Sequence, residues 1–235
     1  MRRDVTIIPL NEEELLIISS DNAGGIGEKA EDLVKTDYET LARMTLRVAI
    51  MECLSTGAEP ISIILHNFSG EKAWDLFVRG CEKLLAELHY ENIEISGSSE
   101  TNFDLLQSNI GITVVGKVQK RKLKIGKTPP DSKIAVIGKP LVGVEVLREE
   151  SMIAPLTLFL KLIGYAGVYE CVPVGSKGIL FETNLLFPNR KIEEHHSDIS
   201  LVKSSGPSTC FIVTYKSIFE NEIREIAGNL FFSID

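Results

Sequence analysis

Apolar residues along the chain form short runs typical of strands. The first run, Leu15 to Lys29 (LLIISSDNAGGIGEK), starts as an apolar strand that ends in an acid and continues into a glycine-rich turn. Other β-branched or alternating runs predict further strands. They cover residues 61–68, 92–96, 110–118, 132–138, 167–174, 199–203 and 209–215.

Apolar residues spaced by three and four positions predict helices between these strands. Thr36 to Glu39 has the T-x-x-E form of a capping box and Gly57 suits the C′ position, so we expect a helix over residues 37–56. The clearest amphipathic pattern runs from Trp74 to Leu88. Later helices are expected after residue 138, around 154–163, within 176–187 and over 217–228.

A basic connection separates two parts of the chain. Residues 117–131 (KVQKRKLKIGKTPPD) carry many positive charges and end at Pro129-Pro130, which is typical of a solvated surface segment. We place a domain boundary within residues 119–132 and expect domains of 1–125 and 130–235. His195-His196 lies in a charged segment, EEHHSD, and is interpreted as an exposed loop.

Composition narrows the class of partner. The 235 residues are 44% apolar, enough for a sizeable core, and the formal charge of −8 argues against general affinity for nucleic acid or an anionic membrane. The segment MRRDVTIIPL lacks the apolar part of a signal peptide, and no apolar stretch reaches about 18 residues. We therefore expect a cytoplasmic protein with a small-molecule substrate and neither a nucleic-acid nor a membrane partner.

The cysteines predict neither a zinc site nor a disulfide framework. The four of them lie far apart, without a CxxC pair and mostly within apolar runs; they are Cys53, Cys81, Cys171 and Cys210. We expect reduced thiols buried as small apolar side chains.

Three carboxylates occupy comparable places in the pattern. Asp21 follows the first strand, Glu52 lies near the end of a largely apolar helix, and Glu100 follows a later strand in the polar turn GSSETNF. Glycine-rich turns after strands are common without a ligand, and a single acid beside one proves little. Convergence of the three acids would suit Mg²⁺ and nucleotide phosphates, because hard cations take oxygen ligands.

The sequence also resembles a known family. Asp21 with GGIGEK, then AIMECLSTGAEP at 49–60, then GSSETN at 97–102 are similar in order and approximate spacing to the ATP-binding domain of the aminoimidazole ribonucleotide synthetase-related (PurM-like) superfamily. That superfamily includes thiamine-monophosphate kinase, selenophosphate synthetase and a hydrogenase maturation protein. The likeness covers roughly residues 4–145, and within the superfamily it is greatest to the α-ribazole kinases of cobalamin salvage.

Two motifs depart from the family pattern. An Asn-Asp pair usually precedes G-A-x-P by five residues, whereas this chain has Met51-Glu52 before Gly57-Ala58-Glu59-Pro60. The usual Gly-Gly-acid of the third motif is Ser98-Ser99-Glu100, which keeps the acid and loses the glycines.

The resemblance implies an α+β fold of two domains, with an N-terminal mixed sheet that forms a barrel with a second subunit and a shortened C-terminal domain. It implies a homodimer that uses ATP and Mg²⁺. Asp21, Glu52 and Glu100 would be the catalytic and metal-binding acids. The implied ATP-binding residues are Asn22, Gly24, Gly25, Gly27, Lys29 and Asn102, with Lys29 compensating phosphate charge.

The implied function is ATP-dependent phosphoryl transfer to a small molecule, with the hydroxyl of a nucleoside-like substrate such as α-ribazole as the first candidate. An ATP-dependent synthetase or cyclase is one alternative. A degenerate nucleotide-binding protein without catalysis is another, favoured by the two motif departures. The loop SSGPST at 204–209 is a candidate for contact with the acceptor.

Overall fold

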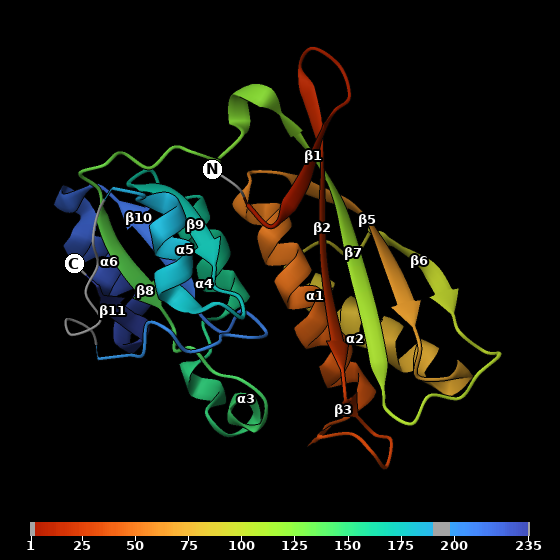
Figure 1. Cartoon of the computed structure of the whole chain (residues 1–235). Coiled ribbons are helices and arrows are strands. Elements are labelled where there is room, and N and C mark those ends of the chain that lie inside the picture. Colours follow the sequence, from red (N-terminus) through yellow and green to blue (C-terminus); the bar gives the residue numbers. More distant parts are fainter. Residues whose placement is uncertain (1–2, 190–197, 235) are drawn as a thin grey trace. The chain divides into compact units, whose positions relative to one another are not determined.

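The computed structural model describes residues 3–189 and 198–234 and divides into two compact units (Figure 1). The first unit comprises Asp4–Leu123. The second unit begins at Lys124 and also includes Arg3. The predicted exposed loop at His195-His196 lies outside the described residues.

The first unit is built on a five-stranded sheet with the strand order β1-β2-β7-β5-β6. The β5–β6 pair is parallel and the other neighbours are antiparallel. The strands are β1 (Val5–Pro9), β2 (Glu14–Gly24), β7 (Asn109–Gln119), β5 (Glu59–Asn67) and β6 (Glu94–Ser99). Strand β1, at the edge of the sheet, was not predicted, because four of its five residues are exposed and buried and exposed positions do not alternate along it.

Helix α1 (Tyr38–Ser55) confirms the predicted long helix but begins differently. Asp37 is the N-cap: its carboxylate accepts hydrogen bonds from Thr40 N at 2.7 Å and Thr40 Oγ1 at 2.8 Å. The predicted capping box is therefore wrong, because the carboxylate of Glu39 instead forms an ion pair with Lys83. Gly57 has φ +84°, as expected of a C′ residue.

Helix α1 lies on one face of the sheet, and α2 (Trp74–Glu87) packs against α1 (Figure 1). The Ser19 hydroxyl donates to the Ala49 carbonyl at 2.6 Å, which fixes α1 over β2. A Cβ on Gly116 would stand 2.4 Å from Cys53 Sγ, and a Cβ on Gly80 would stand 2.2 Å from the Glu39 carbonyl oxygen. Glycine thus permits both close crossings, helix on sheet and helix on helix.

The second unit is a four-stranded antiparallel sheet with the order β11-β8-β10-β9. Its strands are β8 (Lys133–Ile137), β9 (Val168–Pro173), β10 (Phe211–Tyr215) and β11 (Phe231–Ser233). Its helices are α3 (Val144–Arg148), α4 (Leu156–Ile163), α5 (Gly178–Leu186) and α6 (Glu220–Ala227). The two faces of this sheet are covered by different helices.

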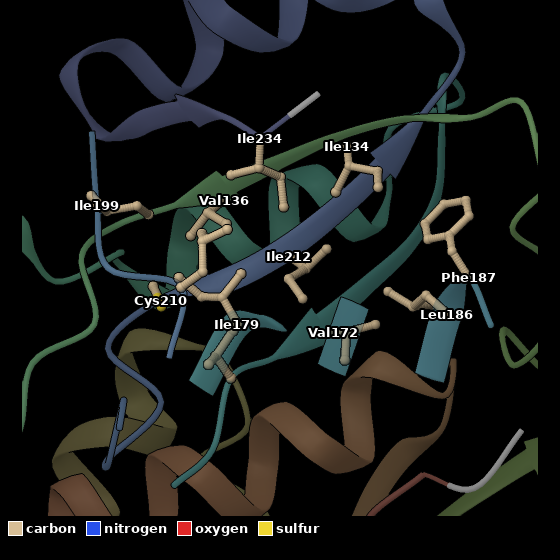
Figure 2. Packing of buried hydrophobic residues seen from close by; sticks show 12 residues of the cluster. Ile134, Val136, Val172, Ile179, Leu186, Phe187, Ile199, Cys210, Ile212 and Ile234 are labelled. Atoms are coloured by element: carbon tan, nitrogen blue, oxygen red, sulfur yellow. The ribbon is translucent and has the colours of Figure 1, made fainter. Parts of the chain in front are cut away.

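Helix α5 covers one face of this second sheet. Figure 2 shows Ile179 and Leu186 of α5 directed at Val172 and Ile212 of the sheet. On the other face, Phe159 of α4 meets Phe211 edge-on, with ring centroids 4.9 Å apart. Both faces are therefore apolar, which is why β8 and β10 appear in the sequence as continuous apolar runs.

One predicted strand is wrong. Residues 199–203 are described and form no strand; they run as an irregular segment whose Leu201 carbonyl accepts from Leu180 N at 2.8 Å. Ile199 and Leu201 are buried in the core of the second unit. Their apolar alternation reflects packing beside α5 and not pairing in a sheet.

The four cysteines are buried thiols, as predicted. Burial raises the pKa of Cys53, Cys81 and Cys171 to about 12 in each case, so these thiols stay protonated at neutral pH. Among the described residues, no helix combines the length and the apolar character that a membrane crossing requires.

The crossing of α1 and α2 predicts the effect of Gly80→Ala. Alanine favours helix by about 1 kcal/mol over glycine, but the new methyl group would stand 2.2 Å from the backbone oxygen of Glu39, which cannot move cheaply. We expect a net loss of about 1–2 kcal/mol in the free energy of unfolding, measured by denaturant titration. Gly175→Ala is the matched control, because a Cβ there has no neighbour within 4 Å. Equal stability of the two variants would contradict the close crossing.

Candidate functional site

Asp21 lies within strand β2 and not in the turn after it. The strand continues to Gly24, and Asp21 pairs with Ile112 of β7. Because neighbouring strand residues face opposite ways, Asp21 shares the helix-covered face with Ser19, whereas Asn22 lies exposed on the open face. The side chains of Asp21 and Asn22 therefore point to opposite faces of the sheet.

The carboxyl group of Asp21 is only partly exposed. Burial raises the pKa of Asp21 to about 6; the hydrogen bond from the Asn22 backbone opposes this effect, and the charge of Asp4 adds to it. A desolvated carboxylate of this kind is stabilised by any cation that reaches it. The pKa of Asp21 is thus displaced upward, whereas that of Glu100 lies below its ordinary value.

Hydrogen bonds within the chain hold the glycine-rich segment in place. After Gly24 it forms two short parallel strands, β3 (Ile26–Gly27) and β4 (Val34–Lys35). The buried Asp32 carboxylate accepts from Lys29 N at 2.8 Å and from Ser108 N and Oγ, both at 2.7 Å. Burial works to raise the pKa of Asp32, but the hydrogen bonds from Ser108 and Lys29 hold that pKa below its ordinary value.

The glycines of this segment are explained by packing against residues 107–109. A Cβ on Gly24 would stand 2.4 Å from Asn109 Oδ1, and one on Gly27 would stand 2.7 Å from Ser108 Oγ. Gly25 has φ +71°, and its N–H donates to the Ser108 carbonyl at 2.9 Å. That N–H is already used, and the backbone of Gly27 is engaged in the parallel pairing of β3 with β4. Of the predicted backbone contacts with phosphate, that of Gly24 is left.

Lys29 is tied to the same region. Its ammonium donates to the Leu105 carbonyl at 2.7 Å, and Gln107 Nε2 donates to the Glu31 carbonyl at 2.7 Å. An ammonium has three donors and the Leu105 carbonyl uses one. Lys29 therefore keeps capacity for an anion.

Glu100 lies in the loop after β6, as predicted. Its N–H donates to the Asn67 carbonyl at 2.8 Å, and its carboxylate accepts from Asn102 N at 2.6 Å. The hydrogen bond from the Asn102 backbone is the main reason why the pKa of Glu100 lies below its ordinary value. Glu100 and Asn102 thus form one ionised local unit.

Glu52 lies on α1, and the contact between Ala49 and Ser19 separates it from Asp21 along β2. Helix α1 runs antiparallel to β2, since Tyr38 approaches Gly27 and Ala49 approaches Ser19. Residues after Ala49 therefore lie beside the first half of β2, while Asp21 lies beyond Ser19 on the other side. Glu52 is half-buried and its Oε2 atom is buried.

The three predicted acids do not meet within one chain. Over residues 3–189 and 198–234, no group of three or more His, Cys, Asp and Glu is placed to hold a metal ion. A Mg²⁺ site made of Asp21, Glu52 and Glu100 is therefore not a feature of the single chain.

By strand register, a polar row crosses the open face of the sheet where β2, β5 and β6 approach their ends. Asn22 pairs with Gly111, Gly111 with His66, and His66 with Ser98. Strands about 4.8 Å apart make this row roughly 14 Å long. Glu100 follows Ser98 by two residues, so three strands and the loop after β6 bring separate polar groups to one end of the sheet.

Sequence reasoning missed Asp32 and His66. Asp32 looks like one of several acids in a polar segment, and its partner Ser108 is 76 positions away. His66 has no neighbour at ligand spacing in the sequence, and only the strand register brings it beside Gly111 and Ser98. Alternation within residues 61–68 was the one available signal that His66 faces away from the buried residues.

The loop proposed for acceptor contact is largely internal. Ser205, Ser208 and Thr209 are buried, and Thr209 Oγ1 donates to the Lys139 carbonyl at 2.7 Å. The same hydroxyl accepts from Leu141 N at 2.9 Å. These side chains hold the second unit together.

A pocket of about 470 Å³ lies beside the N-terminus of α1, and none of the nine predicted residues is part of its lining. It is lined by charged groups that pair with one another or with close neighbours, such as Lys83 with Glu39 and Arg43 with Glu87 at 2.8 Å. Its helix end is already capped by Asp37 and by Glu28, which accepts from Tyr38 N at 3.1 Å.

No protein-family model and no curated protein sequence matches the chain. Solved structures match it in fold. HypE of the HypE–HypF complex is 15% identical over 99% of this chain and 86% of that chain, with a TM-score of 0.67. Thiamine-monophosphate kinase from Stenotrophomonas maltophilia is 14% identical over 99% of this chain and 88% of that chain, with a TM-score of 0.63.

A third match, the structure of AaThiL complexed with AMPPCP and TMP, is 11% identical over 99% of this chain and 83% of that chain, with a TM-score of 0.62. At these identities the likeness is one of fold. The predicted class is confirmed: the chain has a mixed α+β fold of the PurM-like type.

The raised pKa of Asp21 predicts a pH-dependent gain from Asp21→Asn. The pKa in the folded chain, about 6, exceeds the ordinary 3.8, so the folded state favours the protonated carboxyl and is penalised increasingly as pH rises from 3.8 through 6. Asparagine resembles the protonated form. We expect the variant to be more stable by about 2 kcal/mol at pH 7.5, with the difference vanishing near pH 4.

Denaturant titration at both pH values measures this gain. The exposed Asp104→Asn is the control, for which we expect no comparable change. A difference between Asp21→Asn and the parent chain that is the same at both pH values would contradict the burial of this carboxylate.

Proposed function

We propose that the chain binds ATP and transfers its γ-phosphoryl group to a small-molecule acceptor. The observation that carries the proposal is the polar end of the first sheet, where Asn22, His66, Ser98 and Glu100 are gathered from three strands and the loop after β6. The fold likeness to a thiamine-monophosphate kinase, and to a structure that holds AMPPCP, an ATP analogue, supports the same reading.

In-line phosphoryl transfer needs positioning and charge neutralisation more than covalent chemistry. In the proposal, Asn22 and the Glu100–Asn102 unit position the nucleotide at the open end of the sheet. The remaining donors of the Lys29 ammonium and the N–H group of Gly24 compensate phosphate charge. Asp21 contributes a carboxylate whose burial makes it receptive to a cation.

Mg²⁺ is part of the proposal as the ion that accompanies ATP. Since the three acids do not meet within one chain, no step is assigned to an ion held by all three. Glu52 keeps its predicted role as a functional acid, and its replacement is the test of that role.

Catalysis is tested by nucleotide binding and by ADP release. ATP with Mg²⁺ should raise the melting temperature of the chain, and ADP should be released when the right acceptor is added. α-Ribazole is the first acceptor to try, followed by thiamine monophosphate and by the aminoimidazole precursors used by a synthetase or cyclase. Binding of ATP without ADP release from any of these acceptors would favour the non-catalytic nucleotide-binding protein. A chain that does not bind ATP would contradict the proposal.

We predict that Glu52→Gln abolishes ADP release while the fold is kept. The amide has nearly the same volume as the carboxyl group but lacks its negative charge, so packing in α1 is preserved. Circular dichroism and the melting temperature monitor folding in the same samples. Glu82→Gln, at an exposed position on α2, is the matched control and should keep full activity. Activity retained in Glu52→Gln would remove Glu52 from the site.

The proposal includes a homodimer formed through the open face of the first sheet. That face carries Ile8, Leu16, Ile18, Ile64 and Val115, which lie in one apolar patch by strand register. Within the chain these side chains are half-buried or exposed, Ile8 to 41%. Apolar patches of this kind mark contact surfaces.

Ile18→Lys should therefore give a monomer. A charge at the centre of the patch cannot be buried in a sheet-to-sheet contact without a partner. Size-exclusion chromatography with light scattering measures the mass. Ile218→Lys, which changes an isoleucine that is 78% exposed in the second unit, is the control and should leave the oligomeric state unchanged. A parent chain that is already monomeric would contradict the dimer.

A further inference from the structure

A fully buried carboxylate in the second unit collects hydrogen bonds from the segment that connects the two units. Glu170, in β9, accepts from Gly126 N at 3.2 Å, Lys127 N at 2.8 Å and Thr128 N at 2.9 Å. Thr128 Oγ1 adds a fourth donor at 2.7 Å. The side chain of Glu170 is 0% exposed.

The same carboxylate meets the start of the chain. Arg3 Nη1 lies 3.9 Å from Glu170 Oε2, and the Arg3 side chain is 3% exposed. Arg3 belongs to the second unit, although Asp4, which follows it, belongs to the first. The chain crosses between the units at two places, Arg3–Asp4 and Leu123–Lys124, and residues beside both crossings are bound to Glu170.

The local structure explains why a charge is needed here. Pro129 and Pro130 follow the bound segment, so residues 126–128 cannot continue into a sheet ladder and their N–H groups need another acceptor. Glu170 pairs across the sheet with Thr214, whose hydroxyl lies 2.8 Å from Thr128 Oγ1. Hydrogen bonds from N–H groups to a carboxylate are stronger than those to a neutral acceptor.

We propose that Glu170 is the anchor of the hinge between the two units. It fixes both crossings to the second unit and confines bending to the junctions Arg3–Asp4 and Leu123–Lys124. Lys124 strengthens the same border, because its ammonium donates to the Ile163 carbonyl within the second unit. This inference does not depend on the proposed function, so it stands or fails independently of ATP binding.

The basic connection supplies its own test with trypsin. Lys120, Arg121 and Lys122 are exposed and lie on the first-unit side of the junction, whereas Lys127 is exposed but its peptide bond to Thr128 is held at both ends by Glu170. We expect cleavage after residues 120–122 in the parent chain and little after Lys127. Glu170→Gln should accelerate cleavage after Lys127 roughly ten- to hundredfold, because the hydrogen bonds lose a charged acceptor.

A matched carboxylate provides the control. Glu145, in the same unit, also accepts a backbone N–H, from Val142 at 3.0 Å, and pairs with Lys203, but it touches neither crossing. Glu145→Gln should leave the cleavage rate after Lys127 unchanged. An unchanged rate in Glu170→Gln, or an equal rise in Glu145→Gln, would overturn the proposal.

Hydrogen exchange separates an anchor from a residue that merely stabilises the second unit. In Glu170→Gln, the exchange rate of the amides of residues 126–128 should rise while β10 keeps its protection. An equal rise in the exchange rate of β10 would overturn the proposal that Glu170 anchors the hinge. If Glu170→Gln does not fold, Thr128→Val replaces it. That variant removes one donor to Glu170 and should raise the rate of cleavage after Lys127 severalfold. A rate that does not rise would overturn the proposal.

Discussion

The Asp32 carboxylate holds the first unit together at its functional end. It binds Lys29 of the glycine-rich segment and Ser108 at the start of β7, two parts of the chain that are far apart in sequence. Together with the bonds from Gly25 to Ser108 and from Gln107 to Glu31, it fixes the segment after β2 against residues 107–108. The exposed Asn22 and the loop containing Glu100 owe their common location to the same end of the sheet, through the pairing of β2, β7, β5 and β6.

The carboxylates of this chain fall into two physical classes. Asp32 and Glu170 each accept at least three hydrogen bonds and hold distant segments. Asp21 differs, since burial outweighs its hydrogen bond and raises its pKa. A buried carboxylate that accepts several hydrogen bonds holds segments of the chain together. A desolvated carboxylate at the open end of a sheet is suited to a cationic ligand. That contrast, more than the glycines, marks the candidate site.

Much of the fold follows from the sequence because its signals are local. The helical spacing of Trp74 to Leu88 predicted α2, and alternation predicted β7. The errors come from tertiary contacts. Residues 199–203 have the alternation of a strand but pack beside α5, and Glu39, expected in a capping box, pairs with Lys83 on another helix.

The candidate site was less predictable for the same reason. Gly24 and Gly27 look like phosphate-loop glycines, but their lack of a Cβ is required by Asn109 and Ser108, more than 80 positions away. The direction of Glu52 depends on the antiparallel course of α1 over β2, which no local pattern encodes. Position along the chain identified the acids, and only the strand register showed which of them lie at one end of the sheet.

Amide-resolved hydrogen exchange with and without AMPPCP and Mg²⁺ tests whether nucleotide binds at the open end of the sheet and not on the glycine segment. We expect the Gly25 amide, which is bonded to Ser108, to be protected before the nucleotide is added and to stay unchanged afterwards. New protection should appear at Asn22 and across residues 98–102. Strong new protection at Gly25 with none at 98–102 would contradict the account.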